Sequence, residues 1–188
     1  FIDDFLIVVR HSNIGLKPAY KYGLQSIFAI AFYFLAKAFL PGFNTEVTLH
    51  FVNTTVNFGW FYPILVYFMF TAESNAVNLT DGLDGLATGV SMIAIAPFVL
   101  FALMNKQTDV AITAVTLLGA LVGFLYFNYH PARIFMGDCG SLALGGFLAA
   151  MAIVTKQELL LLIIGIVPLL ETLSVIIQVV SFKTRGKR

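Results

Sequence analysis

Charged residues and cysteine are both scarce in this 188-residue sequence. Only 11% of the residues are Asp, Glu, Lys or Arg, whereas 59% are hydrophobic and the mean hydropathy is +0.90. Because soluble domains carry about 25% charged residues, this composition excludes a water-soluble globular protein and a disordered chain. The single cysteine, Cys139, excludes an internal disulfide framework. The net charge of +1 gives no overall attraction to nucleic acid, so we expect no nucleic-acid partner.

The sequence also lacks an initiating Met and a signal peptide. A signal peptide combines a basic region, a short apolar run and a small-residue cleavage site. The chain instead opens with Phe1-Ile2-Asp3-Asp4, which has none of these features. We therefore expect it to be a piece of a longer protein.

Long apolar runs are what the sequence does contain. A helix that crosses a bilayer needs about 20 mostly apolar residues. Six runs of this kind cover about residues 24–40, 56–72, 86–104, 110–128, 142–155 and 159–182. Pro168 lies inside the last run, where it removes a backbone hydrogen bond and should kink or break the helix. The sequence thus predicts an all-α, polytopic membrane bundle with about six transmembrane helices, forming one domain over residues 1–188.

The connecting segments predict which helix ends share a side of the membrane. Residues 1–22, 73–85, 129–141 and 183–188 are each separated by two spans, so they lie on one side. That side holds eight of the 11 Lys and Arg residues, and the positive-inside rule makes it cytoplasmic. The opposite side holds residues 41–55, where polar and β-prone residues favour a short β-hairpin.

The segment from Asn75 to Gly85 is the most informative polar stretch. Asn75, Asn78, Asp81 and Asp84 place two carboxamides and two carboxylates in eleven residues, and the glycines among them permit close backbone approach to a ligand. Asn, Asp and Gly are also ordinary turn residues, and Asp81 could simply cap the next helix. The whole set favours a binding site, whereas for a single Asp both alternatives stay open.

A second acidic loop centres on Asp138, which lies between Gly137 and Gly140 just before an expected helix. A helix start presents free N–H groups and a positive dipole end, which suits a phosphate. The Asp138 carboxylate is a suitable oxygen ligand for Mg²⁺. Alternatively, Asp138 or Ser141 caps the helix, and the sequence does not decide between the two.

The start of the chain adds two further acids and a lysine. Asp3 and Asp4 are adjacent like charges, and a metal ion would relieve their repulsion. Lys21 can meet a phosphate as a point charge, although a lysine beside a membrane also anchors to lipid headgroups. Three acidic segments with basic side chains on one side together indicate Mg²⁺-assisted phosphoryl transfer.

Two other functional classes stay open. A cation-coupled transporter is suggested by the broken last span and by Glu171 inside it, since intramembrane acids often mark function. Glu171 could equally bond to the broken backbone near Pro168. Transporters usually show paired repeats with midplane sites, whereas here no repeat is visible and most acids lie at one face. A non-catalytic membrane scaffold is the third alternative.

Four segments resemble the phospho-N-acetylmuramoyl-pentapeptide transferase (translocase) family, one of the polyprenyl-phosphate N-acetylhexosamine-1-phosphate transferases. These segments are FIDD from Phe1, NAVNLTDGLDGLA from Asn75, NYHPARIFMGDCGSLALGG from Asn128 and ETLSVIIQ from Glu171. Their order and spacing match the family along nearly the whole chain. Related enzymes that attach N-acetylglucosamine phosphate to polyprenol share the Asp motifs but differ around NAVNLTDG, and they are the closest alternative.

The resemblance implies a multi-pass enzyme of the bacterial inner membrane with its active site on the cytoplasmic face. It implies Mg²⁺-dependent transfer of phospho-MurNAc-pentapeptide from UDP-MurNAc-pentapeptide to undecaprenyl phosphate. The products would be lipid I and UMP, which places the reaction in peptidoglycan biosynthesis and cell-wall formation. It further implies that this chain is a catalytic core without the family's early spans and its His-rich C-terminal loop. The oligomeric state is open, with a homodimer among the alternatives.

Individual roles also follow from the resemblance, position by position. Asp138 resembles the Mg²⁺ ligand, Asp3 the base that deprotonates the lipid phosphate, and Asp4 its essential neighbour. Asp81 and Lys21 resemble further catalytic groups beside the diphosphate. The substrate-binding residues would be Asn75, Asn78, Gly82, Leu83, Asp84, Phe135, Gly137 and Ser141, with Phe135 stacking on the uracil base. The sequence departs from some members at Ile7 and His11, where they carry lysines.

Overall fold

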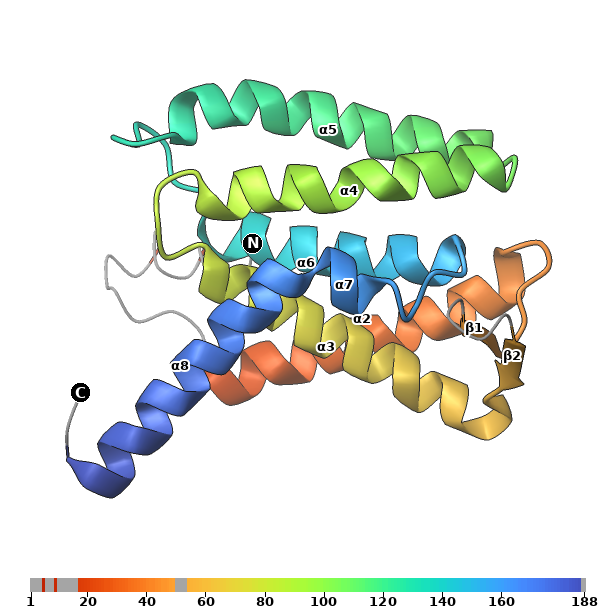
Figure 1. Ribbon diagram of the computed structural model, residues 1–188, viewed down its shortest axis with the longest axis horizontal. Helices are drawn as coiled ribbons and strands as arrows, with labels where there is room; N and C mark the ends of the chain where they lie inside the picture. Colours follow the sequence, from red (N-terminus) through yellow and green to blue (C-terminus); the bar gives the residue numbers. More distant parts are fainter. Residues whose placement is uncertain (1–4, 6–8, 10–16, 50–53, 187–188) are drawn as a thin grey trace.

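Long helices running side by side make up most of the computed structural model, which describes residues 5, 9, 17–49 and 54–186 (Figure 1). Among the described residues, the long helices are α2 (Pro18–Phe39), α3 (Tyr62–Thr80), α4 (Leu86–Met104), α5 (Thr108–Asn128), α6 (Gly137–Val154) and α8 (Ile166–Arg185). The short elements are β1 (Glu46–Leu49), β2 (Thr54–Asn57), the 3-10 helix η1 (Gly59–Phe61) and α7 (Leu161–Ile164). The all-α bundle with a small hairpin that the sequence predicts is therefore confirmed.

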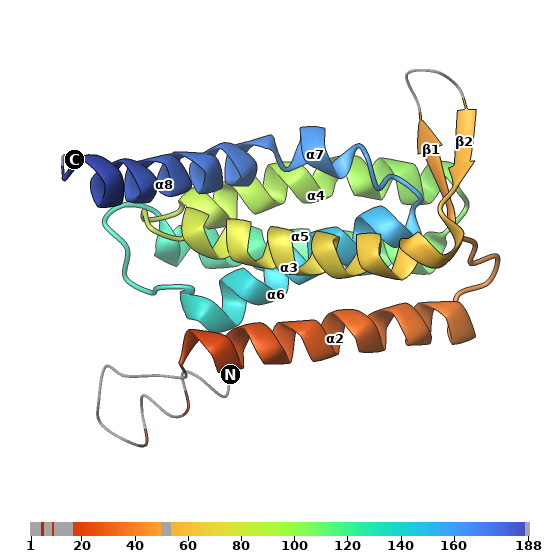
Figure 2. The ribbon, with the colours of Figure 1, turned by 90° about the horizontal axis from the view of Figure 1, so that it is seen from below.

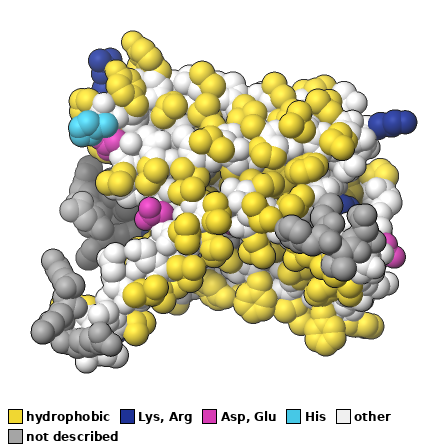
Figure 3. All heavy atoms as spheres, viewed as in Figure 1, with side chains coloured by type: hydrophobic (Ala, Val, Ile, Leu, Met, Phe, Trp, Pro, Cys, Tyr) yellow, Lys and Arg dark blue, Asp and Glu magenta, His cyan; other side chains and the backbone are white. Residues whose placement is uncertain are grey.

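Five of these helices, α2, α4, α5, α6 and α8, are long and apolar enough to cross a membrane. The sixth, α3, has 19 residues but carries Glu73, Asn75 and Asn78 in its second half. Large apolar side chains cover the outside of the bundle, while most charged groups lie towards its two ends (Figure 3). This distribution is typical of a protein whose outer surface meets lipid or further apolar helices.

The limits of several helices differ from the sequence prediction. Helix α2 begins at Pro18, ahead of the expected start at about residue 24. The expected span 56–72 is present as α3 but lies later in the chain, because β2 occupies its expected start and α3 continues to Thr80. The expected span 142–155 begins too late because α6 already starts at Gly137. In α3 and α6 polar residues read as loop are helical, because their side chains lie among neighbouring helices: Thr80 and Ser141 are buried. Burial within the bundle overrides the local turn preference of these residues.

The hairpin is confirmed, and it extends slightly past its expected limit of residue 55. The two strands pair antiparallel, with Glu46 opposite Asn57 and Leu49 opposite Thr54. The α6–α7 turn packs beneath it, since Lys156 donates to the backbone carbonyl of Asn44 over 2.7 Å. The hairpin and the α4–α5 and α6–α7 turns lie at one end of the bundle, which we call the hairpin end (Figures 1 and 2).

We call the opposite end of the bundle the site end. It contains the connecting segments that the alternation of the spans places on one side of the membrane. The starts of α2, α4 and α6 lie there together with the ends of α3, α5 and α8 in both views (Figures 1 and 2). Side-chain contacts agree: Lys21 of α2 bonds to Asp138 of α6, and Thr88 of α4 bonds to Asn128 of α5. The chain order alone therefore brings the polar loops together.

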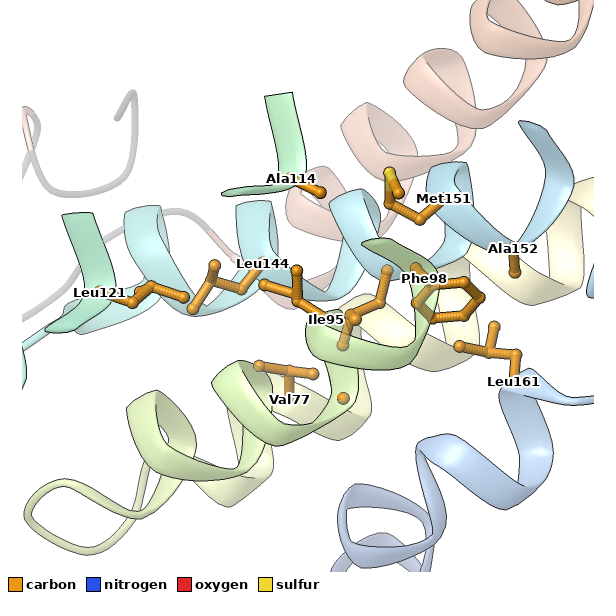
Figure 4. Packing of buried hydrophobic residues seen from close by; sticks show 11 residues of the cluster. Val77, Ile95, Phe98, Ala114, Leu121, Leu144, Met151, Ala152 and Leu161 are labelled. Atoms are coloured by element: carbon orange, nitrogen blue, oxygen red, sulfur yellow. The ribbon is translucent and has the colours of Figure 1, made fainter. Parts of the chain in front are cut away.

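The core lies between α3, α4, α5 and α6 (Figure 4). Val77, Phe98, Leu148 and Met151 are buried in it. The backbones of α3 and α6 touch at Gly145, where an added Cβ would lie 2.4 Å from the Glu73 carbonyl oxygen and 2.5 Å from Ser74 Cα. Close helix contact through a small residue is a usual means of association in membranes, and here it holds Asn78 against α6.

The last span is broken, as Pro168 predicts, but the break is at Gly165. Helix α7 ends at Ile164 and α8 begins at Ile166, with Gly165 between them. Pro168 instead lies in the first turn of α8, where a missing N–H costs nothing because the first N–H groups of a helix have no partner within it.

Candidate functional site

Asp138 is the centre of a polar cluster at the site end. Its Oδ2 lies 2.5 Å from Lys21 Nζ, and its Oδ1 accepts a hydrogen bond of 2.9 Å from Asn78 Nδ2. The three residues come from α6, α2 and α3. The Lys21 and Asp138 side chains are 30% and 33% exposed, so a ligand can reach them. The structure thus brings together three residues that the sequence analysis singled out separately.

The start of α6 holds Asp138 in place. Gly137 opens this helix with a φ of +65°, a conformation that favours glycine. Ser141, one turn later, donates to the Gly137 carbonyl and accepts from Asn78, each over 2.9 Å. No side chain caps α6, so Asp138 and Ser141 do not serve as the helix cap that the sequence left open. An acidic residue in the first turn is nevertheless stabilised by the helix dipole.

Asp81 lies directly after α3 and beside this cluster. Burial raises the pKa of its carboxyl group, and the nearby negative charge of Asp138 adds to the increase. The backbone N–H of Gly137 opposes the increase by bonding to the ionised form. Two neighbouring carboxylates of this kind attract a cation. Asp81 does not cap α4, since that helix begins without a side-chain cap.

Asn75 lies one turn before the cluster on α3. Its Nδ2 donates to the Thr71 carbonyl over 2.6 Å and to Gln25 Oε1 of α2 over 2.9 Å. Gln25 was missed by sequence reasoning, because a glutamine in an apolar run carries no motif. These bonds link α2 to α3 on the same side as Lys21.

Asp84 joins the two polar loops. Its Oδ2 accepts from the backbone N–H of Ala132 over 3.0 Å and lies 3.1 Å from His130 Nδ1. The Ala132 N–H lowers the pKa of Asp84 most; desolvation opposes this effect, and His130 lowers the pKa further. Leu83 and Phe135 are exposed on the two loops that Asp84 connects. His130 is a second site residue that sequence reasoning did not find, because the sequence alone does not show its contact with Asp84.

Three predicted site residues, Gly82, Asp3 and Asp4, lie outside the contacts described above. Gly82 is exposed in the turn after α3. Asp3 and Asp4 lie outside the described residues, so their predicted roles stay predictions.

Whether the cluster can bind a metal ion depends on which metal-ligating side chains it contains. In the described part of the chain, no three His, Cys, Asp or Glu side chains gather as a ready-made cage. Mg²⁺ does not need one, because it usually keeps several waters and takes one or two carboxylates plus substrate phosphates. Asp138 and Asp81 can supply those carboxylates, with Lys21 alongside for a phosphate.

Comparison with known proteins covers all of these residues. The sequence matches the family model of glycosyl transferase family 4 over residues 1–156. Proteins from Halalkalibacterium halodurans, Bacillus licheniformis and Bacillus cytotoxicus are 53%, 52% and 53% identical to it over all 188 residues. Each of the three is named phospho-N-acetylmuramoyl-pentapeptide-transferase. The chain spans 57% of the length of each of these relatives.

Proposed function

Because this chain belongs to glycosyl transferase family 4, we propose that its full-length protein transfers phospho-MurNAc-pentapeptide from UDP-MurNAc-pentapeptide to undecaprenyl phosphate. The products are lipid I and UMP. The names of relatives about half identical along the whole chain support this substrate choice. The observation that carries the proposal is the cluster of Lys21, Asn78 and Asp138, with Asp81 beside it, at one end of a membrane bundle.

The reaction joins two anionic groups, so neutralising charge is the main task of the site. An oxygen of the lipid phosphate bonds to the sugar-linked phosphorus, and the bond from that phosphorus to the UMP oxygen breaks. Lys21 donates to phosphate oxygens as negative charge collects on them. Asp138 and Asp81 would hold Mg²⁺, which neutralises the diphosphate when bound. Asp3 enters as the base only through the family resemblance.

The position of the cluster suits two substrates of opposite character. UDP-MurNAc-pentapeptide is water-soluble and reaches the site end from the aqueous side. Undecaprenyl phosphate lies in the membrane, where the apolar outer faces of α2 and α8 are largely exposed. The phosphate of this lipid lies at the membrane surface, at the same depth as the polar ends of the helices and away from their apolar middle parts. The distribution of Lys and Arg supports a cytoplasmic location for this end in the bacterial inner membrane.

UMP release by the purified full-length protein tests the proposal. We expect Asp138→Asn to abolish turnover at all Mg²⁺ concentrations, because the amide lacks the charge that holds the ion. Asp109→Asn is a matched control, since Asp109 also lies in the first turn of a long helix but at the hairpin end. Turnover by Asp138→Asn at the normal rate would contradict the proposal. Equal turnover of UDP-N-acetylglucosamine would instead favour the related polyprenol transferases.

A further inference from the structure

Glu73 is an acidic residue inside the bundle that the proposed reaction does not use. The sequence places it in a loop, whereas the structure places it in α3, seven residues and about 10 Å before the end of that helix. Its Oε1 is buried without a hydrogen-bond partner. The ion pairs formed by described residues join Lys21 to Asp138, His130 to Asp84 and Lys156 to Glu158, and none includes Glu73.

The Glu73 carboxyl group lies at the break between α7 and α8. A Cβ built on Gly165 would lie 2.9 Å from Glu73 Oε1 and 3.3 Å from Oε2. The same point is 3.0 Å from the carbonyl oxygen of Leu161. Gly165 is buried, and α8 packs against α3 next to it. Three oxygen atoms therefore lie within 3.3 Å of one point where the helix is interrupted, and a side chain added at Gly165 would displace the Glu73 carboxyl group.

The Leu161 carbonyl accepts the Gly165 N–H over 2.7 Å, but Glu73 Oε1 has no donor, which is unfavourable in an apolar interior. A buried ionised carboxylate that has no cation is costly enough to take up a proton instead. The titratable groups on the elements packed against Glu73 are remote or already engaged. Asp138 of α6 pairs with Lys21 of α2, and Lys37 of α2 lies in the last turn of that helix, at the hairpin end. On α8, Glu171 is exposed six residues beyond the break, and Lys183 lies near the far end.

We propose that Glu73 carries a proton in the folded protein and that its O–H is shared with the Leu161 carbonyl, directly or through one water molecule. A shared proton turns the repulsion among these oxygens into an attraction and ties α3 to the end of α7. It uses the second lone pair of the Leu161 carbonyl, whose first hydrogen bond comes from the Gly165 N–H, and it gives the buried carboxyl group a partner at the break. Glu73 is thus a positioning residue that fixes the direction in which α8 leaves the bundle towards the site end.

Glu73, rather than Glu171, contacts the interrupted backbone of the last span. Glu171 lies in the broken span itself, and a bond to its freed backbone is one of the two alternatives that the sequence leaves open. In the structure it is exposed on α8, whereas Glu73 reaches the break from α3. Losing the Glu73 proton at alkaline pH should loosen the attachment of α8, because the carboxylate would then repel the Leu161 carbonyl.

The test is a distance measurement on the full-length protein in a lipid bilayer, with spin labels at the exposed positions Val179 of α8 and Val122 of α5. We expect a narrow distance distribution at neutral pH that broadens at alkaline pH. Glu73→Gln, which stays neutral and keeps a donor, should remain narrow at every pH, whereas Glu73→Ala should be broad throughout. Glu171→Gln is the matched control and should behave like the unmodified protein.

Infrared spectroscopy supplies a second measurement that needs neither activity nor substrate. The carbonyl stretch of a buried, protonated carboxylic acid should be lost in Glu73→Gln at neutral pH. If Glu73→Gln removes no such band, the carboxyl group is ionised or holds a cation, and the inference is wrong. It is equally wrong if Glu73→Ala gives the distance distribution of the unmodified protein. Neither result depends on the proposed transferase activity.

Discussion

Lys21 Nζ lies 2.5 Å from Asp138 Oδ2, although 117 residues separate the two in the sequence. The contact joins the first turns of α2 and α6 at the site end. Each partner has a second task in the proposed reaction, since Lys21 suits a phosphate and Asp138 suits a metal ion. In the structure the two charges partly neutralise each other, so a phosphate or a metal ion would compete with this contact.

Replacing Lys21 should impair catalysis more than folding. The pair is about one-third exposed, so its loss costs little stability. Charge-assisted hydrogen bonds to a phosphate are worth about 1.5–3 kcal/mol, so Lys21→Ala should lower kcat/KM by roughly 10- to 100-fold. UMP release by the full-length protein measures this. Lys37→Ala, at the other end of the same helix, should leave kcat/KM unchanged, and an equal effect of both variants would contradict a specific role for Lys21.

Replacing Asn78 should reduce stability as well as activity. Asn78→Ala removes the donor that serves both Asp138 and Ser141. Asp138 keeps Lys21 and Ser141 keeps the Gly137 carbonyl, but both bonds between α3 and α6 are lost at about 0.5–1.5 kcal/mol each, so the thermal unfolding temperature should fall. Gln178→Ala is the control, because Gln178 is exposed and bonds only to Ser174 one turn away. An unfolding temperature that stays unchanged in Asn78→Ala would show that these bonds do not hold α3 to α6.

The adjacent glycines of α6 offer a sharper test of the α3–α6 contact. A Cβ on Gly145 would lie 2.4 Å from the Glu73 carbonyl oxygen, so Gly145→Ala must push the two helices apart. We expect a loss of about 3 kcal/mol or more, because the obstacle is backbone and cannot rotate away. On Gly146 the nearest atom would be Ser74 Oγ at 3.5 Å, so Gly146→Ala should be tolerated. Thermal unfolding of both variants in one detergent compares them directly, and similar melting temperatures would refute the contact.

The sequence predicted the order and direction of the helices far better than it predicted which side chains contact one another. Long apolar runs and chain continuity are enough to place Lys21, Asp81 and Asp138 at one end of the bundle, because each span must return the chain to the other side. The partners depend on how each helix is rotated about its axis, and hydropathy does not encode this. Asn78 therefore looked like a loop residue, although its amide bridges two residues of α6. Gln25 carried no sequence signal at all.

Asp81 should be destabilising at neutral pH, as expected for a group kept for function. Its folded-state pKa is raised, chiefly by burial. Its contribution to stability is therefore fully present below its unfolded pKa and is lost as pH rises through the folded value. Asp81→Asn should accordingly unfold at a higher temperature than the unmodified protein at pH 7, with the difference shrinking in acid, while UMP release is abolished. Melting curves across pH without Mg²⁺ test this, and a less stable Asp81→Asn at pH 7 would reverse the sign of the argument.

Asp84 should show the opposite pH dependence, because its pKa is lowered, first by the Ala132 N–H and then by His130. Its contribution is present above its unfolded pKa and is lost as pH falls through the folded value. Asp84→Asn keeps one acceptor oxygen for Ala132 but loses the charge beside His130. Because Asp84 holds the two loops together, this variant should raise KM for the UDP substrate and have a smaller effect on kcat. His130→Ala should give the same change in weaker form, because the backbone bond to Ala132 survives. A kcat defect with unchanged KM in either variant would mean that Asp84 acts on the chemistry rather than by holding the two loops together.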